Sequence, residues 1–288
     1  MATLFSKKWH SYKQDPKSLL LFLLVCLAAC ITMIALLFII GYILVKGIPH
    51  LTPELFDIKY TSKNVSLLPA LVNTLFIIVL SLFFAVPVGI SAAIYLAEYA
   101  QRGNKVVHII NLTTETLSGI PSIVYGLFGS LFFVKYLGFG LSLLSGACTL
   151  SIMILPLIMR TTQEALKNVP DSYREGSFGL GAGKLRTIFS IVLPCAIPGI
   201  LSGVILGIGR IVGESAALIF TAGTVAEIIP TIFSSARTLS VHMYALSGEG
   251  LYINQTYATA VVLLIVVIFI NMVSNFIAKK IGKNTIKN

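Results

Sequence analysis

Long apolar runs alternate with short polar segments along this chain, and the pattern predicts membrane-spanning helices. The uncharged run over 18–45 exceeds the roughly 20 residues that an α-helix needs to cross a bilayer. Further apolar runs predict spans over about 67–96, 106–134, 141–159, 188–222 and 257–278. The polar connection 223–256 is expected to contain short helices around 227–236. We therefore expect an all-α integral membrane protein with six transmembrane helices.

The composition supports an integral membrane protein and gives no indication of disulfide bonds or metal binding. Of the 288 residues, 56% are hydrophobic and only 11% are charged, whereas soluble domains carry roughly 25% charged residues. The four cysteines lie in apolar runs without a CxxC spacing, and the four histidines are scattered. Neither a disulfide framework nor a metal site is indicated.

The basic residues predict how the chain is oriented. With the N-terminus in the cytoplasm, most of the 21 lysines and arginines face inside. Only Lys46, Lys59, Lys63, Lys135 and Arg237 then fall outside. The positive-inside rule therefore favours cytoplasmic tails over 1–17 and 279–288, a transmembrane domain over 18–278 and a cytoplasmic loop over 160–187.

Two spans carry ionisable residues where a lipid-facing helix would not. The third span contains Glu115 and the helix-breaking sequence Gly119-Ile120-Pro121, so it should face protein or a cavity. Arg160 closes the fourth span, where it could simply anchor the helix at the cytoplasmic surface. Glu115 could likewise only pair with a hydroxyl or a cation of a neighbouring helix.

Arg210 and Glu214 lie in the second half of the fifth span, where an ionisable residue costs at least about 2.5 kcal/mol unless it has a partner or water. Their i, i+4 spacing puts both on one helical face, so they could neutralise each other and hold helices together. Alternatively, the guanidinium binds a tetrahedral oxyanion. Glu214 would then orient Arg210 or accept a hydrogen bond from a protonated ligand oxygen, which phosphate retains near neutral pH and sulfate does not.

Glycines in this fifth span predict close helix packing. Gly203 and Gly207, and then Gly209 and Gly213, form two GxxxG registers. Helix packing is the first expectation for them and substrate contact the second.

A polar, glycine-bearing stretch over 173–198 interrupts the apolar pattern on the cytoplasmic side. Residues 173–178 predict a short helix, the glycines at 179, 181 and 183 allow a turn with positive φ, and 184–191 predict the start of a second helix. Small residues would let another protein approach the backbone closely. The stretch is interpreted as a socket for a soluble partner.

The spacing in this stretch resembles the EAA loop of ABC-importer permeases. Glu175-Gly176-Ser177 is followed after three residues by Gly181, and after nine more by Ile191-Val192-Leu193-Pro194. Gly176 and Ser177 depart from the alanines usual in that family. The resemblance assigns contact with an ATPase to the following residues: Tyr173, Arg174, Glu175, Gly176, Ser177 and Gly181.

Together with the stretches 115–129, 159–181 and 210–223, the loop makes the chain similar to A-type permease subunits of bacterial phosphate-specific (Pst) ABC importers. The resemblance covers about 68–278 and implies the type I ABC-importer permease fold. It also implies that Arg210, Glu214 and Arg160 serve phosphate movement, and we add Glu115 as a pathway candidate.

The resemblance further implies an assembly in the bacterial inner membrane. Its other members would be a C-type permease forming a heterodimer, two copies of an ATP-binding subunit and an extracytoplasmic phosphate-binding protein. The chain has no P-loop, G-x-S-x-G or H-E-x-x-H motif. We therefore expect it to be no enzyme and to bind no cofactor, with ATP and Mg²⁺ used by the partner ATPase.

Two alternatives remain from the sequence. The first is an ABC-importer permease for another oxyanion or small solute. The second is an ion-coupled secondary transporter in which Glu115 and Glu214 are the coupling carboxylates.

Overall fold

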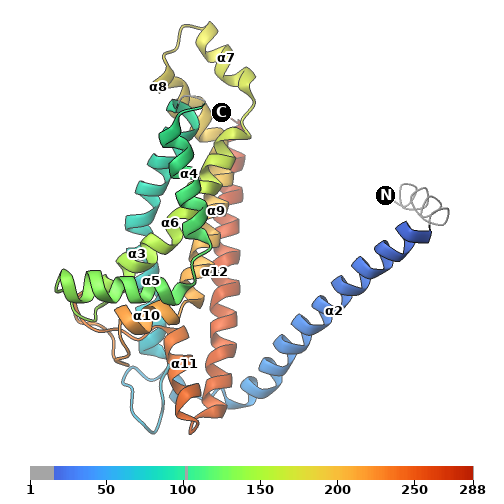
Figure 1. Ribbon diagram of the computed structural model, residues 1–288. Coiled ribbons are helices and arrows are strands. Elements are labelled where there is room, and N and C mark those ends of the chain that lie inside the picture. The colour runs from blue at the N-terminus through green and yellow to red at the C-terminus, as the bar shows by residue number, and fades with distance from the viewer. Residues whose placement is uncertain (1–15, 101–102, 288) are drawn as a thin grey trace.

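A computed structural model describes residues 16–100 and 103–287, and all regular secondary structure in these ranges is helical (Figure 1). The expectation of an all-α protein is therefore confirmed for this part of the chain. Residues 1–15 of the expected N-terminal tail, Arg102 and Asn288 lie outside the described residues.

Five stretches of helix are long and apolar enough to cross a membrane, and a bent pair makes a sixth. The first is α2, Pro16–Gly47, and the second is α3, Leu68–Ile94, which continues through the π-helical turn η3, Tyr95–Tyr99. The others are α6, Leu143–Lys167, then α9, Leu193–Gly213, and α12, Ile253–Lys287. A short helix α8, Lys184–Thr187, and a π-helical turn η5, Ile188–Val192, lead without a break into α9.

The expected third span is not one straight helix. It consists of α4, Lys105–Ser118, and α5, Ser122–Gly129, which meet at 103° before the π-helical turn η4, Ser130–Tyr136. Pro121 supplies no backbone N–H and disfavours helical geometry at Ile120, so the helix ends where the sequence showed its breaker. Figure 1 shows α4 running along the bundle and α5 lying across it.

Two further expectations were wrong, namely the end of the fifth span and the short helix around 227–236. The fifth span was expected to reach residue 222, but α9 ends at Gly213 because Glu214 is extended, and a separate helix α10, Ala216–Thr221, follows. No helix forms within 224–238: Ile232 and Ser234 give their carbonyls to backbone N–H groups at the start of α6. These hydrogen bonds replace those that a helix would have made.

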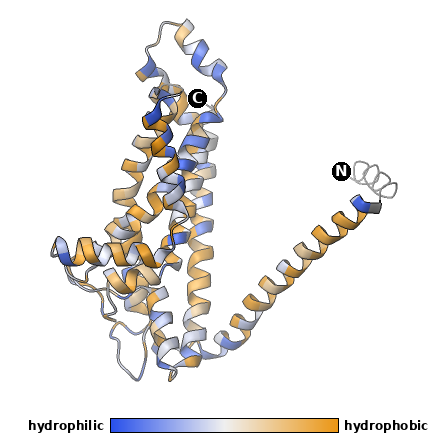
Figure 2. Cartoon of the chain, in the orientation of Figure 1, coloured by the Kyte–Doolittle hydropathy of each residue, from blue (hydrophilic) through white to orange (hydrophobic). Residues whose placement is uncertain are grey.

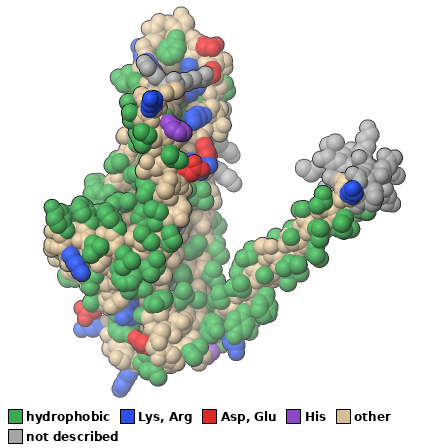
Figure 3. Space-filling model, viewed as in Figure 1, with side chains coloured by type: hydrophobic (Ala, Val, Ile, Leu, Met, Phe, Trp, Pro, Cys, Tyr) green, Lys and Arg blue, Asp and Glu red, His purple; other side chains and the backbone are tan. Residues whose placement is uncertain are grey.

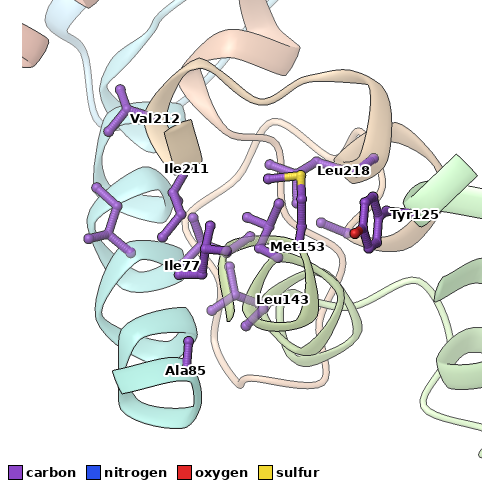
Figure 4. Packing of buried hydrophobic residues seen from close by; sticks show 14 of the residues in the cluster. Ile77, Ala85, Tyr125, Leu143, Met153, Ile211, Val212 and Leu218 are labelled. Carbon is purple, nitrogen blue, oxygen red and sulfur yellow. The ribbon is translucent and has the colours of Figure 1, made fainter. Parts of the chain in front are cut away.

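Three spans form the centre of the bundle. Figure 4 shows Ile77 from α3, Met153 from α6 and Ile211 from α9 converging on one buried cluster. Leu218 of α10 and Tyr125 of α5 close its side. At the end of the bundle away from α7 lie two 3₁₀ turns, Ile48–His50 and Pro53–Phe56, and α11, Leu239–Glu249 (Figure 1).

The first span stands apart from this bundle. It meets α12 at Gly47, where an added Cβ would lie 2.4 Å from the Tyr257 carbonyl oxygen, and it diverges from there (Figure 1). None of the most apolar window of α2 is buried within the chain, and Figure 2 shows this helix as hydrophobic along most of its length. Charged side chains gather toward the ends of the bundle with hydrophobic surface between them (Figure 3). Both features fit a chain surrounded by lipid and partner helices.

Only one of the two predicted glycine registers is used for packing within the chain. A Cβ on Gly203 would lie 2.7 Å from Thr161 Cβ, so α9 packs closely against α6 there. Gly209 and Gly213 have no atom within 4 Å of such a Cβ.

Replacing Gly203 with alanine should therefore destabilise the chain, since overpacking typically costs about 1–3 kcal/mol. Gly209→Ala is the matched control and should be neutral or slightly stabilising, because alanine favours a helix over glycine by up to about 1 kcal/mol. The thermal unfolding midpoint in detergent measures the stability of both variants. Equal tolerance of the two substitutions would contradict the packing described.

Candidate functional site

A cavity of about 590 Å³ opens between α4, α6 and α9 in the half of the bundle that carries the hairpin over 168–187, called the coupling loop below. The expected loop began at residue 160, but α6 continues to Lys167. Three of the four pathway candidates line it: Glu115 from α4, Arg160 from α6 and Arg210 from α9. Residues separated by almost a hundred positions in the chain are thus brought to one site. The expectation that the third span faces a cavity agrees with this arrangement.

The cavity has a polar wall along its whole depth. Lys167, in the last turn of α6, marks the mouth, and Pro156, three turns deeper, marks the far end with Arg210. Hydroxyl groups of Thr114, Ser118 and Thr161 lie between them. These hydroxyls donate to backbone carbonyls of their own helices, so the cations are the groups that an anion moving along this wall would meet.

The cations differ in how firmly they are held. Arg160 Nε donates to Glu164 Oε1 at 3.2 Å, one helical turn away, and both side chains are more than 60% exposed. Such an exposed pair contributes roughly 0–1 kcal/mol, so an incoming anion can compete for the guanidinium. Within residues 16–100 and 103–287, no ion pair or hydrogen bond occupies Arg210, which is half-buried at the far end.

Sequence reasoning missed several members of the wall. Lys167 was counted only among the basic residues of the predicted cytoplasmic side, and Glu164, Gln163 and Asn111 were not noted. Gln163 Nε2 lies 3.4 Å from Asn111 Oδ1, across the gap between α6 and α4. The i, i+3, i+4 and i+7 spacing of 160, 163, 164 and 167 was the available signal, because it puts these polar residues on one helical face.

Glu214 does not share the cavity with Arg210. Because α9 ends at Gly213, the expected i, i+4 geometry is lost, and Glu214 turns into the protein, where it is 9% exposed. Its Oε1 accepts a hydrogen bond of 3.0 Å from the Ala217 backbone N–H, in the first turn of α10. The Ser240 hydroxyl donates to its backbone carbonyl. These contacts fix the junction of α9, α10 and α11.

The coupling loop forms the hairpin that the sequence predicts. Helix α7, Asp171–Gly179, contains the expected 173–178 helix, and the turn uses Gly181 at φ +82°. Gly179 stays helical and Gly183 has a negative φ. The second helix begins at Lys184, and the Ser177 and Thr187 hydroxyls, 2.8 Å apart, hold the two arms together.

The outer side of this hairpin carries the features of a socket. Tyr173, Phe178 and Leu180 are exposed, and Leu180 is 92% exposed. Glu175 and Gly176 are also at the surface, and a groove of about 480 Å³ runs beside Tyr173, Gly176 and Gly181. Ser177 is buried against the second arm but still lines this groove, and Arg174 turns inward to Glu98.

Comparison with known proteins decides the family. Residues 85–287 match the family described as the binding-protein-dependent transport system inner membrane component. The chain belongs to this family. The expected class, a multi-pass membrane permease of ABC importers, is thereby confirmed.

Individual relatives agree with this permease family. The chain is 33% identical over 281 residues to the probable ABC transporter permease protein YqgI of Bacillus subtilis (strain 168), covering 91% of this chain and 95% of that protein. It is 36% identical over 219 residues to the phosphate transport system permease protein PstA of Pasteurella multocida (strain Pm70), covering 74% and 76%.

A solved structure shares the fold of this permease. A bacterial ABC transporter involved in the import of the acidic polysaccharide alginate superposes with a TM-score of 0.66 at 16% identity, covering 95% of this chain and 99% of that one. The expected ABC-importer permease fold is confirmed by this likeness.

The placement of Glu214 leads to a test that separates a structural from a transport role. Glu214→Gln keeps an oxygen for the Ala217 N–H, so both folding and transport by the permease should stay close to wild type. Glu214→Ala removes the acceptor and should lower the thermal unfolding midpoint, since losing such a cap costs about 1 kcal/mol. A well-folded Glu214→Gln variant that no longer transports would instead show that the carboxylate charge acts in the pathway.

Proposed function

We propose that this chain is a permease subunit of an ATP-driven importer of inorganic phosphate, forming half of the translocation pore. The observation that carries the proposal is the cavity that joins Arg210, Arg160 and Lys167 on one polar wall next to the coupling loop. The relatives named as phosphate permeases support the choice of substrate.

The side chains of the wall suit a tetrahedral oxyanion. A guanidinium offers paired N–H donors that match two oxygens of a phosphate, and its charge persists at every physiological pH. Arg210 would receive the anion at the deep end, and Arg160 and Lys167 would pass it toward the cytoplasm. Transport needs such contacts to be individually weak, because a site that binds too tightly would retain its cargo.

Glu115 is the carboxylate best placed to distinguish a protonated anion from a fully deprotonated one. It lines the same cavity as Arg210, whereas Glu214 is occupied by α10. A carboxylate accepts a hydrogen bond from the P–OH group of phosphate but repels sulfate, which carries no proton near neutral pH. We therefore transfer to Glu115 the selective role that the sequence suggested for Glu214.

The remaining surfaces suit the other members of an importer. The hairpin with Tyr173, Glu175, Gly176 and Gly181 would dock on one of two ATP-binding subunits. Helix α2, which buries nothing of its most apolar window within the chain, would pack on a C-type permease in a heterodimer. The opposite end of the bundle would receive the phosphate-binding protein.

In this scheme the chain itself binds no cofactor and performs no catalysis. ATP and Mg²⁺ act on the partner ATPase, which would close on ATP and drive the pore outward-open. Both termini and the coupling loop face the cytoplasm of a bacterial inner membrane. Neither another oxyanion nor ion-coupled secondary transport has a separate observation in its favour.

Arg210→Gln should abolish most phosphate uptake while leaving the assembly intact. Loss of a charged hydrogen bond costs about 1.5–3 kcal/mol, so uptake should fall at least about tenfold. The measurement is ATP-dependent uptake of radiolabelled phosphate by proteoliposomes that contain both permeases, the ATPase and added binding protein. Lys46→Gln, the same charge change at an exposed residue outside the cavity, is the control and should transport normally.

Unchanged uptake in the Arg210→Gln variant would exclude this arginine from the pathway. Wild-type proteoliposomes that hydrolyse ATP but take up no phosphate would exclude phosphate as the substrate.

Glu115→Gln should relax selectivity rather than stop transport. Removing the negative charge removes the repulsion of a fully deprotonated anion, so excess sulfate should compete with phosphate uptake in the variant several-fold better than in wild type. The competition is measured at pH 7.5 in the same proteoliposomes, with Glu164→Gln as the control at the mouth of the cavity. Identical sulfate competition in wild type and the Glu115→Gln variant would contradict this role.

A further inference from the structure

Arg174 lies on the coupling helix but faces the bundle instead of the outside. Its Nη2 is 2.7 Å from Glu98 Oε1 and its Nε is 3.4 Å from Glu98 Oε2, so the guanidinium holds both carboxylate oxygens. The two side chains are only 16% and 9% exposed. Resemblance to other EAA loops gave Arg174 a place in the ATPase contact, but the geometry gives it internal partners.

The same guanidinium also reaches the end of α6. Its Nη1 donates to the Val169 carbonyl at 2.8 Å, and its Nη2 donates to the Leu166 carbonyl at 2.9 Å. Carbonyls in the last turn of a helix have no intrahelical donor, and a cation there is also favoured by the helix dipole. One side chain therefore ties together α7, the η3 end of α3 and the cytoplasmic end of α6.

At the other end of α3, Asn73 makes a second set of contacts. This side chain is fully buried, and its Nδ2 donates to the Glu227 carbonyl at 2.8 Å and to the Arg237 carbonyl at 3.3 Å. Its Oδ1 accepts from the Ile229 N–H at 3.3 Å. The next residue, Thr74, accepts from the Leu239 N–H at 2.9 Å. Helix α3 thus holds the extracytoplasmic segment 224–238 at one end and Arg174 at the other.

We propose that Arg174 is a positioning residue that fastens the coupling helix to α3 and α6, so that α3 carries movement of α7 to the extracytoplasmic segment held by Asn73. The proposal rests on the proposed function in one respect, that an ATPase moves α7. It adds the route by which that movement reaches the far side of the pore.

Because the Arg174–Glu98 ion pair is buried, it forms a rigid connection between α7 and α3. Removing one partner of a buried ion pair leaves the other charge without compensation, which is far more costly than losing an exposed pair. The hydrogen bond to Glu98 raises the pKa of Arg174 although burial opposes it, so the link persists at every physiological pH. Asp171 is the second acidic partner, with its Oδ1 3.1 Å from Arg174 Nη1, and it adds little because its side chain is 81% exposed.

The test compares Arg174→Gln, Glu98→Gln and the double variant with Asp171→Asn as the matched control on the same guanidinium. Each is reconstituted with the partner permease, the ATPase and the binding protein. One readout is phosphate imported per ATP hydrolysed. A second is the amount of ATPase that copurifies with the membrane subunits, which reports docking and folding.

A third readout follows the far end of α3 and does not depend on the substrate. A cysteine replaces Val225, which is exposed on the segment 224–238, in a chain whose native cysteines are changed to serine. Its reaction with a membrane-impermeant maleimide is timed in the apo state and in the state trapped with ATP and vanadate.

In wild type and in Asp171→Asn, nucleotide should change the maleimide rate at position 225. In Arg174→Gln and Glu98→Gln the change should vanish and the import per ATP should fall at least about tenfold, with ATPase copurification unchanged. Because the two groups form one link, the double variant should be no worse than either single variant.

Three results would overturn the proposal. They are a nucleotide response that survives in Arg174→Gln, losses that add in the double variant, and an ATPase that no longer copurifies, which would make Arg174 a docking or folding residue. A wild-type chain that shows the nucleotide response but no phosphate uptake would refute only the proposed substrate and would leave the link supported.

Discussion

The cost of placing an arginine inside a membrane governs the arrangement of this chain. Arg210 lies near the end of an apolar span, where it needs water or a partner. Among the described residues the bundle gives Arg210 no counter-ion, but the polar α4 leaves a cavity of about 590 Å³ against α6 and α9, which is large enough to admit water. The cavity and an Arg210 without an ion-pair partner within 16–100 and 103–287 are therefore two consequences of one constraint.

The helix breaks follow from the same requirement. A straight third span would carry Glu115 into hydrocarbon, whereas the bend of 103° at Gly119–Pro121 keeps α4 beside the cavity and sends the apolar α5 across the bundle. The end of α9 at Gly213 lets the Glu214 side chain accept a hydrogen bond from α10 and keeps its charge out of the cavity. What is left on the wall is an array of three cations and two exposed or half-exposed carboxylates, which is suited to a passing anion.

The sequence predicted the spans, the hairpin and four pathway candidates, of which three line the cavity, because hydropathy, glycine spacing and misplaced charge are local signals. Contacts between distant elements were not predictable in this way. The i, i+4 rule for Arg210 and Glu214 assumed a helix that continues, and the extended backbone at Glu214 invalidated it. The inward orientation of Arg174 depends on Glu98, which lies 76 positions earlier in the chain. The wrong helix within 227–236 has the same origin, since its carbonyls are taken by α6 and Asn73.

The central claim is that the wall carrying Arg210 opens to the cytoplasm in one state and to the outside in another. The most direct measurement places a single cysteine at Ser118, beside Glu115 in the cavity, and compares its reaction with an impermeant thiol reagent added from either side of oriented vesicles. The account predicts reaction from the cytoplasmic side without nucleotide and from the external side with ATP and vanadate. Reaction from the same side in both states would contradict it.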